Sequence, residues 1–320
     1  MKKAVTIGID IGGTNSVLGV VDREGNILAE DRISTTQYPV IGEYVSALYG
    51  AVTRALGKVK EEIELQAIGI GAPNGNYYHG TIEHPPNLIW EGVIPLCEMM
   101  SQYTDVPVVL TNDANAAALG EMIYGGAREM KNFIIYTLGT GLGSGIVING
   151  EVLYGSTGFA GEIGHIIMVP GGRDCGCGRQ GCLETYVSAT GIVRTVQELL
   201  GQRRDPSPLR KVAAEALTAR MITDAAKEGD RIALEAFDRT ADMLALSIVN
   251  ATAFSSPEAI FLFGGLSNAG KYLFEPVEKY VNEKIQTIFK GTVRILPSQI
   301  PENNAAILGA SALAWKEIEK

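Results

Sequence analysis

Residues 4–27 read AVTIGIDIGGTNSVLGVVDREGNI, and this stretch is the best guide to the fold. An apolar run over 4–11 ends in the turn Gly12-Gly13-Thr14. A second apolar run, 17–21, leads through a polar turn into a third run that begins at Ile27. Short apolar runs bounded by Gly, Asn and Asp are typical of strands joined by tight turns. The stretch therefore predicts three strands in succession, a β-meander.

The same pattern returns about 130 residues later, in 133–154, which read FIIYTLGTGLGSGIVINGEVLY. Here Gly139–Gly145 is the expected glycine turn between a strand over Phe133–Leu138 and a strand over Ile146–Ile148. Asn149-Gly150 is a strong signal of a two-residue hairpin turn. An internal duplication of this kind predicts an α/β protein of two related lobes that face one another across a central cleft.

Hydrophobic periodicity predicts the remaining elements. Apolar residues at three- and four-residue spacing indicate helices, and short apolar runs indicate strands. The elements expected in this way are helices over Val40–Lys58, Arg220–Ala253 and Asn303–Ile318, and strands over Gln66–Gly71, Val106–Leu110 and Ala259–Phe263. We expect the last helix to pack against the N-terminal lobe. This assigns 1–115 with about 303–320 to a small lobe, and 116–302 to a large lobe.

Composition excludes several classes of protein. The 320 residues are enough for two domains of ordinary size. The net charge of −9 argues against a nucleic-acid partner, and we interpret the basic stretch Arg203-Arg204 with Arg210-Lys211 as a solvated loop. The apolar run near the N-terminus is short for a signal peptide and is interrupted by Asp10. The sequence has no run of ~18 apolar residues that could span a membrane, so we expect a soluble, cytoplasmic protein.

The turn at Asp10–Asn15 has the composition of a phosphate-binding loop. Glycines after a strand let the backbone approach a phosphate, and successive N–H groups form an anion-binding nest. Thr14 and Asn15 add side-chain donors, while Asp10 suits Mg²⁺, directly or through water. The motif is neither a Walker loop nor a dinucleotide fingerprint, and alone it also fits an ordinary hairpin. The second turn, with Gly139-Thr140-Gly141, favours the phosphate interpretation because paired turns can clamp a triphosphate.

Asn112-Asp113 follows the strand over Val106–Leu110. Thr111 or Asn112 is placed to cap a helix, with Asp113 in its first turn. The helix dipole alone favours an acid there, and it should lower the pKa of the Asp113 carboxylate. The functional alternative is a general base that takes the proton of a sugar hydroxyl. For that role orientation matters more than basicity, because the proton leaves late in a loose phosphoryl-transfer transition state. The local sequence favours neither interpretation, a structural acid at a helix start or a catalytic base, over the other.

Three of the four cysteines, Cys175, Cys177 and Cys182, fall within eight residues. With His165, which stands ten residues before the first of them, they make one imidazole and three thiolates, a closed tetrahedral zinc set. Catalytic zinc keeps an open position, so four protein ligands predict a structural ion. His79 and His84 compete weakly for the fourth place. Three unrelated core thiols are the remaining alternative.

Glu162 and Glu184 bracket this metal loop. If zinc fixes His165 through one ring nitrogen, the other N–H can donate to a ligand. Two carboxylates and an oriented imidazole suit the adjacent hydroxyls of a polyol. Asn74 and Asn87, in loops rich in proline and glycine, are candidates for additional hydroxyl contacts, although turn chemistry alone explains both.

With these motifs in place, the chain resembles the ROK family (repressors, ORFs and kinases) and, within it, the bacterial glucokinases. The resemblance covers essentially the whole chain. It rests on both glycine turns, Asn112-Asp113, Glu162-x-Gly164-His165, the cysteine block up to Glu184, and Gly264-Gly265. It implies the actin-like ATPase fold, a duplicated ribonuclease H-like α/β architecture.

The resemblance also implies roles for single residues. Asp113 would be the catalytic base, and sugar contacts would come from Asn112, Asp113, Glu162, His165 and Glu184. The nucleotide site would comprise Asp10, Gly12, Gly13, Thr14, Asn15, Gly139, Thr140, Gly141, Gly264 and Gly265. The family's zinc ligands match His165, Cys175, Cys177 and Cys182. Position 15 varies in similar proteins, so Asn15 is compatible and not diagnostic.

The implied activity is the transfer of a phosphoryl group from ATP, with Mg²⁺, to the 6-hydroxyl of a hexose. Glucose is the first substrate to try, which would place the protein in carbohydrate metabolism at the start of glycolysis. Related kinases for N-acetylmannosamine, N-acetylglucosamine, allose, mannose and fructose share most of these residues, so the sugar stays open. The phosphoryl donor also stays open, since polyphosphate could replace ATP.

Two expectations concern partners. Repressors of the family carry a helix-turn-helix before the first strand, where this chain has only Met1-Lys2-Lys3, so we expect an enzyme and no nucleic-acid partner. A non-catalytic sugar sensor is the alternative of another class. Because dimers and tetramers are common in the family, we expect a homodimer or homotetramer.

Overall fold

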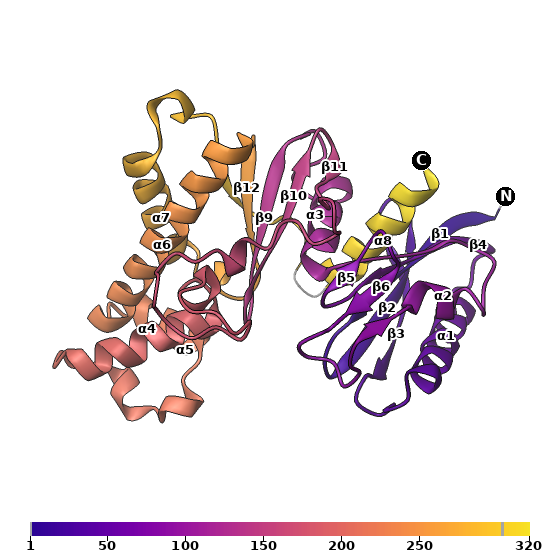
Figure 1. The fold of residues 1–320 in the computed structure, drawn as a ribbon, viewed down its shortest axis with the longest axis horizontal. Helices are drawn as coiled ribbons and strands as arrows, with labels where there is room; N and C mark the ends of the chain where they lie inside the picture. Colours follow the sequence, from indigo (N-terminus) through magenta and orange to yellow (C-terminus); the bar gives the residue numbers. More distant parts are fainter. Residues whose placement is uncertain (1, 302–303) are drawn as a thin grey trace. The chain divides into compact units, whose positions relative to one another are not determined.

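The N-terminal meander forms one side of a five-stranded sheet in the computed structural model, which describes residues 2–301 and 304–320 (Figure 1). In spatial order, the strands are β3 (Ile27–Ser34), β2 (Asn15–Asp22), β1 (Lys3–Ile11), β4 (Ile63–Gly71) and β8 (Val108–Thr111). The first three pair antiparallel, whereas β4 lies parallel to β1, and β8 parallel to β4. The predicted meander is therefore confirmed, and both predicted later strands are present with shifted ends.

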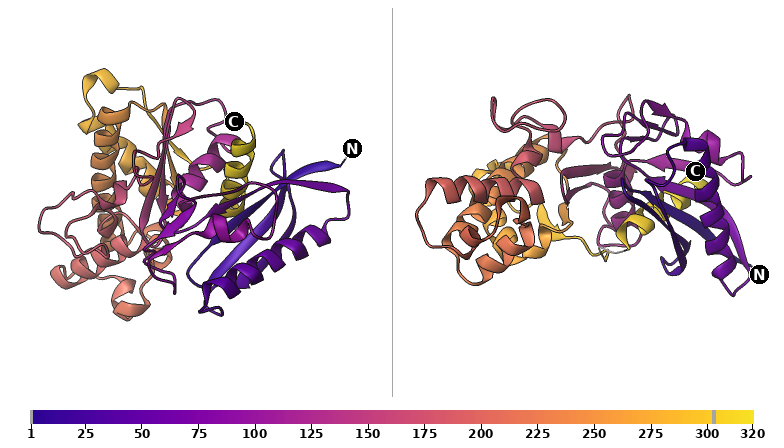
Figure 2. Two further views of the ribbon diagram at one scale, coloured as in Figure 1. Left: turned by 45° about the vertical axis from the view of Figure 1, so that its right-hand side comes forward. Right: turned by 90° about the horizontal axis from the view of Figure 1, so that it is seen from below.

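The alternation of residues in β1 places different helices on the two faces of this sheet (Figure 2). Its odd-numbered apolar residues are fully or almost fully buried in one core with α1 (Ile41–Lys58). Thr6 and Gly8 face α8 (Ala305–Ile318), and the Thr6 hydroxyl lies 2.8 Å from that of Ser311. A Cβ atom at Gly8 would overlap the backbone of α8, so glycine is needed for this close approach. The predicted packing of the last helix on the N-terminal sheet is confirmed, and Asn303, its expected start, lies outside the described residues.

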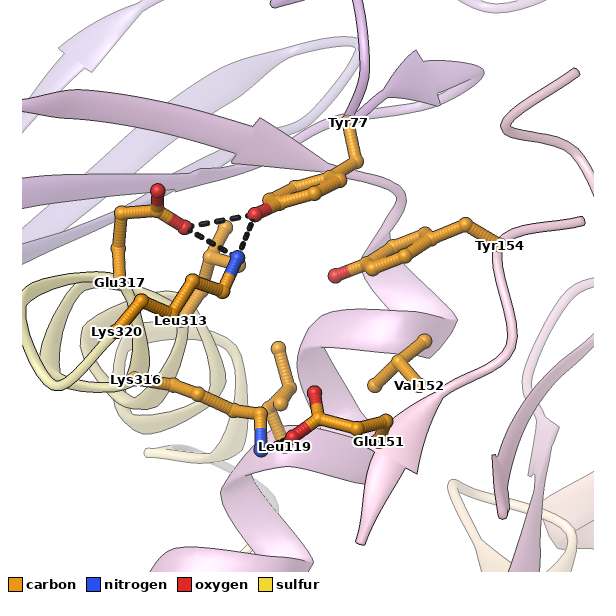
Figure 3. Close-up of a pocket in the computed structure, with 9 residues that line it drawn as sticks. All are labelled: Tyr77, Leu119, Glu151, Val152, Tyr154, Leu313, Lys316, Glu317 and Lys320. Atoms are coloured by element: carbon orange, nitrogen blue, oxygen red, sulfur yellow. Dashed lines mark hydrogen bonds and ion pairs between the residues drawn. The ribbon is translucent and has the colours of Figure 1, made fainter. Parts of the chain in front are cut away.

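A tyrosine anchors the C-terminal end of α8 (Figure 3). The Tyr77 hydroxyl donates to Glu317 at 2.7 Å and lies beside the ammonium group of Lys320. The ring of Tyr77 stacks on that of Tyr154, with 4.3 Å between ring centroids. The cavity beside these side chains measures about 20 Å³. That is room for about one water molecule, so it is no substrate site.

Within the described part of the chain, a second five-stranded sheet repeats the order of the first. Its strands, in spatial order, are β11 (Glu151–Val152), β10 (Leu142–Ile148), β9 (Phe133–Leu138), β12 (Ala259–Phe263) and β13 (Arg294–Pro297). Asn149 and Gly150 have φ values of 55° and 79°, as the predicted hairpin turn requires. The duplication is therefore confirmed. The glycine turn is shorter than predicted, because β10 begins at Leu142 and includes Gly143 and Gly145.

The predicted helix over Arg220–Ala253 is two helices, α5 (Ala219–Lys227) and α6 (Arg231–Ser255). Gly229 takes a φ of 79° between them, and the Asp230 carboxylate caps α6 by accepting from the N–H of Ala233 at 2.8 Å. A glycine in the left-handed region followed by an acidic cap ends one helix and starts the next. The prediction of a single helix was wrong because it rested on the helical spacing of apolar residues and gave too little weight to Gly229 and the Asp230 cap.

In the part of the chain that the structure describes, the remaining elements are three short strands, four α-helices and six single-turn helices. They are β5 (Gly75–Asn76), β6 (Thr81–Glu83), β7 (Val93–Ile94), α2 (Leu96–Met100), α3 (Asp113–Ile123), α4 (Ala189–Gln202) and α7 (Lys271–Lys284), with single-turn helices η1 (Ile163–His165), η2 (Leu183–Thr185), η3 (Pro208–Lys211), η4 (Ala214–Ala216), η5 (Ser267–Ala269) and η6 (Thr287–Phe289). Helices α6 and α7 pack side by side (Figure 1). Among the helices of residues 2–301 and 304–320, none is both long and apolar enough to cross a membrane.

The chain divides into two units by its internal contacts. The first contains the chain up to Met130, Gly145–Ala160 and the segment from Ser298 onward, and the second contains Lys131–Ser144 and Gly161–Pro297. The lobes predicted from the sequence, 1–115 with about 303–320 and 116–302, stay a prediction.

Candidate active site

In the first unit, the glycine turn after β1 is closed by its own backbone. The N–H of Gly12 donates to the carbonyl of Asn15 at 3.0 Å, and the carbonyl of Thr14 accepts from Thr35 at 2.9 Å. A Cβ atom at Gly13 would lie 2.6 Å from the carbonyl oxygen of Asn87. The turn therefore needs glycine at position 13, because the backbone of Asn87 packs against it. The side chain of Asn87 is exposed.

Asp10, at the end of β1, is a half-buried carboxylate next to this turn. Burial, and to a smaller extent the negative charge of Asp113, raise the pKa of Asp10 to about 6. The structure thus brings together the predicted magnesium residue and the predicted catalytic base. Carboxylates whose pKa values are raised by desolvation and by a neighbouring charge are concentrated at functional sites.

Asp113 opens α3, as predicted from the sequence. Asn112 is the cap, because its side-chain oxygen accepts from the N–H of Asn115 at 2.7 Å. A sugar contact from Asn112 could use its Nδ2 or the second lone pair of its Oδ1.

The pKa of Asp113 differs from the expectation. Its side chain is accessible to solvent, yet desolvation by the surrounding protein raises its pKa, while backbone N–H groups, including that of Ala114 at 2.9 Å, act in the opposite direction. We expected the helix N-terminus to lower this pKa, and that prediction was wrong because desolvation outweighs it. A carboxylate with a raised pKa is a stronger base for a hydroxyl proton.

Asn74 has a clear role in its own turn. It takes a φ of 52°, and its Nδ2 donates to the carbonyl of His84 at 3.0 Å. Asparagine is among the residues that tolerate this left-handed conformation. A contact from Asn74 to a sugar could use its side-chain oxygen or the second N–H of its Nδ2.

In the second unit, the predicted metal ligands lie together. The ligand atoms of His165, Cys175, Cys177 and Cys182 all lie within 4.8 Å of one another. The Sγ atoms of Cys177 and Cys182 are 3.7 Å apart, and Nδ1 of His165 is 3.6 Å from Sγ of Cys175. Usual zinc bond lengths in a tetrahedral site give about 3.8 Å between two thiolates and about 3.6 Å between a thiolate and an imidazole. The donor set and its spacing therefore fit a tetrahedral ion, and His79, the competing candidate, instead contacts Glu83 at 3.2 Å.

The two glutamates flank this cluster on single-turn helices. Glu162 is the cap residue of η1, which ends at His165, and Glu184 is the middle residue of η2. Oε1 of Glu184 lies 3.6 Å from Nδ1 of His165 and 2.9 Å from Sγ of Cys175. Because Nδ1 of His165 faces the cysteines, Nε2 is the ring nitrogen that remains for a ligand.

The second glycine turn is held by the segment that follows Glu184. The carbonyl of Gly139 accepts from the N–H of Ala189 at 2.8 Å, and the carbonyl of Thr140 accepts from the Thr190 hydroxyl at 2.8 Å. A Cβ atom at Gly141 would lie 2.7 Å from Oε2 of Glu184. Within this unit, a residue of the predicted sugar site and the predicted nucleotide turn are therefore neighbours.

Gly264-Gly265 also lies beside this turn. Gly264 follows β12 with a φ of 99°, and a Cβ atom on it would lie 2.9 Å from the backbone of Leu138, the last residue of β9. Gly265 is exposed. The paired strands β9 and β12 thus bring both predicted nucleotide segments of this unit to the same edge of the sheet.

Sequence reasoning missed Arg173. Its guanidinium group connects the metal loop to η2 and α4, because it donates to the carbonyl of Thr185 and to the hydroxyl of Thr195. The only local signal was an arginine two residues before Cys175, in a turn otherwise made of small residues.

Two sheets of the same strand order, each with a glycine turn after its first long strand, define the actin-like ATPase fold. The chain belongs to the ROK family, whose model matches residues 6–317. A glucokinase of Thermotoga maritima is 35% identical to it, over 99% of each chain.

Solved structures agree with this assignment. The crystal structure of a ROK family glucokinase from Streptomyces griseus, in complex with glucose and AMPPNP, is 33% identical with a TM-score of 0.80, covering 98% of this chain and 99% of that one. A ROK hexokinase from Thermus thermophilus is 27% identical, also with a TM-score of 0.80, and covers 98% and 99% of the two chains. The protein is a glucokinase-like member of the ROK family.

Proposed function

We propose that this protein transfers a phosphoryl group from ATP to the 6-hydroxyl of a hexose, with glucose as the preferred acceptor. The observation that carries the proposal is the pair Asp10 and Asp113, two carboxylates of raised pKa at the glycine turn of the first unit. The similarity to glucokinases over the full length supports the same reaction.

In this proposal Asp113 orients the 6-hydroxyl and accepts its proton. Its solvent-accessible carboxylate can reach a ligand, and its raised pKa favours taking up a proton. The transferred phosphoryl group and the departing ADP need charge neutralisation, which Mg²⁺ would supply when bound. Asp10 would hold the ion directly or through water, as a carboxylate of this position can.

The remaining roles follow from the two units separately. In the first unit, Gly12, Gly13, Thr14 and Asn15 would contact phosphate, and Asn112, with Asn74 and Asn87, would contact sugar hydroxyls. In the second unit, Gly139, Thr140, Gly141, Gly264 and Gly265 would contact the nucleotide, and Glu162, His165 and Glu184 would contact the sugar. Exclusion of water from the bound substrates would be needed, because water otherwise competes as the phosphoryl acceptor.

The four-ligand cluster supports a structural zinc ion. When bound, the ion supplies a fixed crosslink and no reactive position, since protein atoms fill all four places. His165 would then hold Nδ1 on the ion and Nε2–H toward a sugar oxygen. We further propose a cytoplasmic enzyme of carbohydrate metabolism that acts as a homodimer or homotetramer.

A hexose panel tests the proposal. ADP release should be followed with ATP, Mg²⁺ and glucose, mannose, fructose, allose, N-acetylglucosamine or N-acetylmannosamine, and with polyphosphate in place of ATP. The proposal expects the highest kcat/KM with glucose and ATP. Sugar binding without turnover for every member of the panel would reject it in favour of a non-catalytic sensor, and a better acceptor than glucose would correct the substrate.

A further inference from the structure

Arg173 makes an unusually complete set of hydrogen bonds. An arginine side chain carries five N–H donors, and Arg173 uses all five on residues that the structure describes. Nε and Nη2 donate to the two carboxylate oxygens of Glu198, both at 2.8 Å, and Nη2 also donates to the Thr195 hydroxyl at 3.0 Å. Nη1 donates to the carbonyl of Thr185 at 2.6 Å and to that of Gly191 at 3.1 Å.

The backbone of Arg173 ties the same residue to the metal loop. Its carbonyl accepts from the N–H of Gly181 at 2.8 Å, directly before Cys182. Its N–H donates to the hydroxyl of Tyr186 at 3.0 Å, and its guanidinium lies 4.5 Å from the centre of that tyrosine ring. Arg173 therefore contacts the chain on both sides of Glu184, at Gly181 before it and at Thr185 after it.

The ion pair with Glu198 differs from an ordinary surface pair. The side chain of Arg173 is 13% exposed, so its charge is largely removed from water and needs the bidentate carboxylate. Nη1 donates to the carbonyl of Thr185 in η2 and to that of Gly191 in the first turn of α4. The planar guanidinium group therefore holds these two segments in a fixed relative position. A lysine has three donors on a flexible stem and cannot make this set of contacts.

We propose that Arg173 is a positioning residue that holds η2, and with it the carboxylate of Glu184, in place for the hydroxyls of the sugar. The inference rests on the proposed function, in which Glu184 contacts the substrate. It assigns the position of Glu184 to a clamp separate from the cysteines: a bound metal would hold Cys182 and His165, whereas Arg173 holds the carbonyl of Thr185, the residue after Glu184.

The test is the variant Arg173→Lys, compared with Arg239→Lys. Arg173 and Arg239 both line a cavity of about 280 Å³, but Arg239 donates to Glu235 on its own helix at 2.6 Å. Both variants keep their charge, and only the first disturbs η2. Mutating a residue that orients a metal ligand typically costs about 10- to 100-fold in metal affinity or activity, and we take the same scale for a residue that orients a substrate contact. We expect Arg173→Lys to raise the KM for hexose by at least about tenfold, with kcat and the KM for ATP changed much less and one zinc per chain retained.

A role in folding alone gives a different pattern. Arg173→Lys would then lower the fraction of active protein, and with it the apparent kcat, and would leave the KM for hexose unchanged. This result would overturn the proposal. A rise in hexose KM that accompanies loss of zinc also overturns it, because Arg173 would then act through the metal loop. An equal effect of Arg239→Lys would do the same.

A second variant covers the case in which Arg173→Lys does not fold. Glu198→Gln leaves all five donors of Arg173 in place but weakens the bidentate pair on the exposed side, since the Glu198 side chain is 46% exposed. We expect a smaller rise of the hexose KM with unchanged zinc content, and an unchanged KM would contradict the clamp. Wild-type protein with no hexose kinase activity would reject the proposed function itself, whereas an active wild type with insensitive variants rejects only the role of Arg173.

Discussion

The stability of the protein should carry a pH signature from Asp10. Its pKa of about 6 in the folded chain compares with an ordinary value of 3.8. A difference of about 2 units corresponds to ~3 kcal/mol between the protonation states. Below pH 4 the carboxyl group is protonated in both the folded and the unfolded chain and contributes nothing. Between about pH 4 and pH 6 the unfolded chain has released this proton while the folded chain still holds it, so the folded chain becomes less stable by as much as ~3 kcal/mol, and the loss levels off above pH 6.

The substitution Asp10→Asn removes this titration. We expect the variant to gain stability relative to wild type as the pH rises from 4 to 8, with most of the gain complete near pH 7. Urea unfolding at several pH values, without nucleotide or added magnesium, measures the difference. The pH-dependent part of that difference isolates the carboxylate, because steric effects of the amide are the same at every pH.

Asp113 provides an internal check. Its negative charge is the second cause of the raised pKa of Asp10, so Asp113→Asn should shrink the pH-dependent gain from Asp10→Asn. If the difference between wild type and Asp10→Asn is the same at pH 4 and pH 8, Asp10 is not a desolvated carboxylate and the reasoning fails.

Two further predictions concern the scaffold. Chelation of the metal should lower both the unfolding temperature and the affinity for hexose, because His165 and Glu184 lose their fixed geometry; stripped protein that binds sugar normally would refute a structural role for the ion. Gly69→Ala should destabilise the first unit by about 1–3 kcal/mol, since the added Cβ would overlap the backbone of α8 near Ala310. Gly57→Ala is the matched control, with no neighbour within 4 Å of its Cβ, and thermal unfolding that does not separate the two variants would contradict the packing.

The parts of the fold that sequence predicted are those set by local pattern. β9 and β12 match the predicted strands over Phe133–Leu138 and Ala259–Phe263, because continuous apolar runs flanked by polar or glycine residues identify central strands. The Asn149-Gly150 turn and the Asn112 cap follow from side-chain preferences that act within a few residues. The cysteine spacing likewise predicted which four residues would converge.

The parts that sequence missed depend on contacts between distant residues. The sign of the pKa shift at Asp113 follows from desolvation by the folded protein, which a local helix-dipole argument omits. The hydrogen bonds of Arg173 reach five acceptor atoms of residues 185–198, and no local pattern relates these residues to Arg173. The break before α6 was visible at Gly229-Asp230, but the apolar period on both sides outweighed it.

The most direct test of the central claim is the reaction of Asp113→Ala with ATP and the best hexose of the panel. A positioned general base contributes about 10²- to 10⁴-fold to turnover. We predict a loss of kcat in that range, measured by ADP release, with the hexose dissociation constant from calorimetry changed little. A variant that turns over hexose at a rate near that of wild type would contradict the assignment of Asp113 as the base.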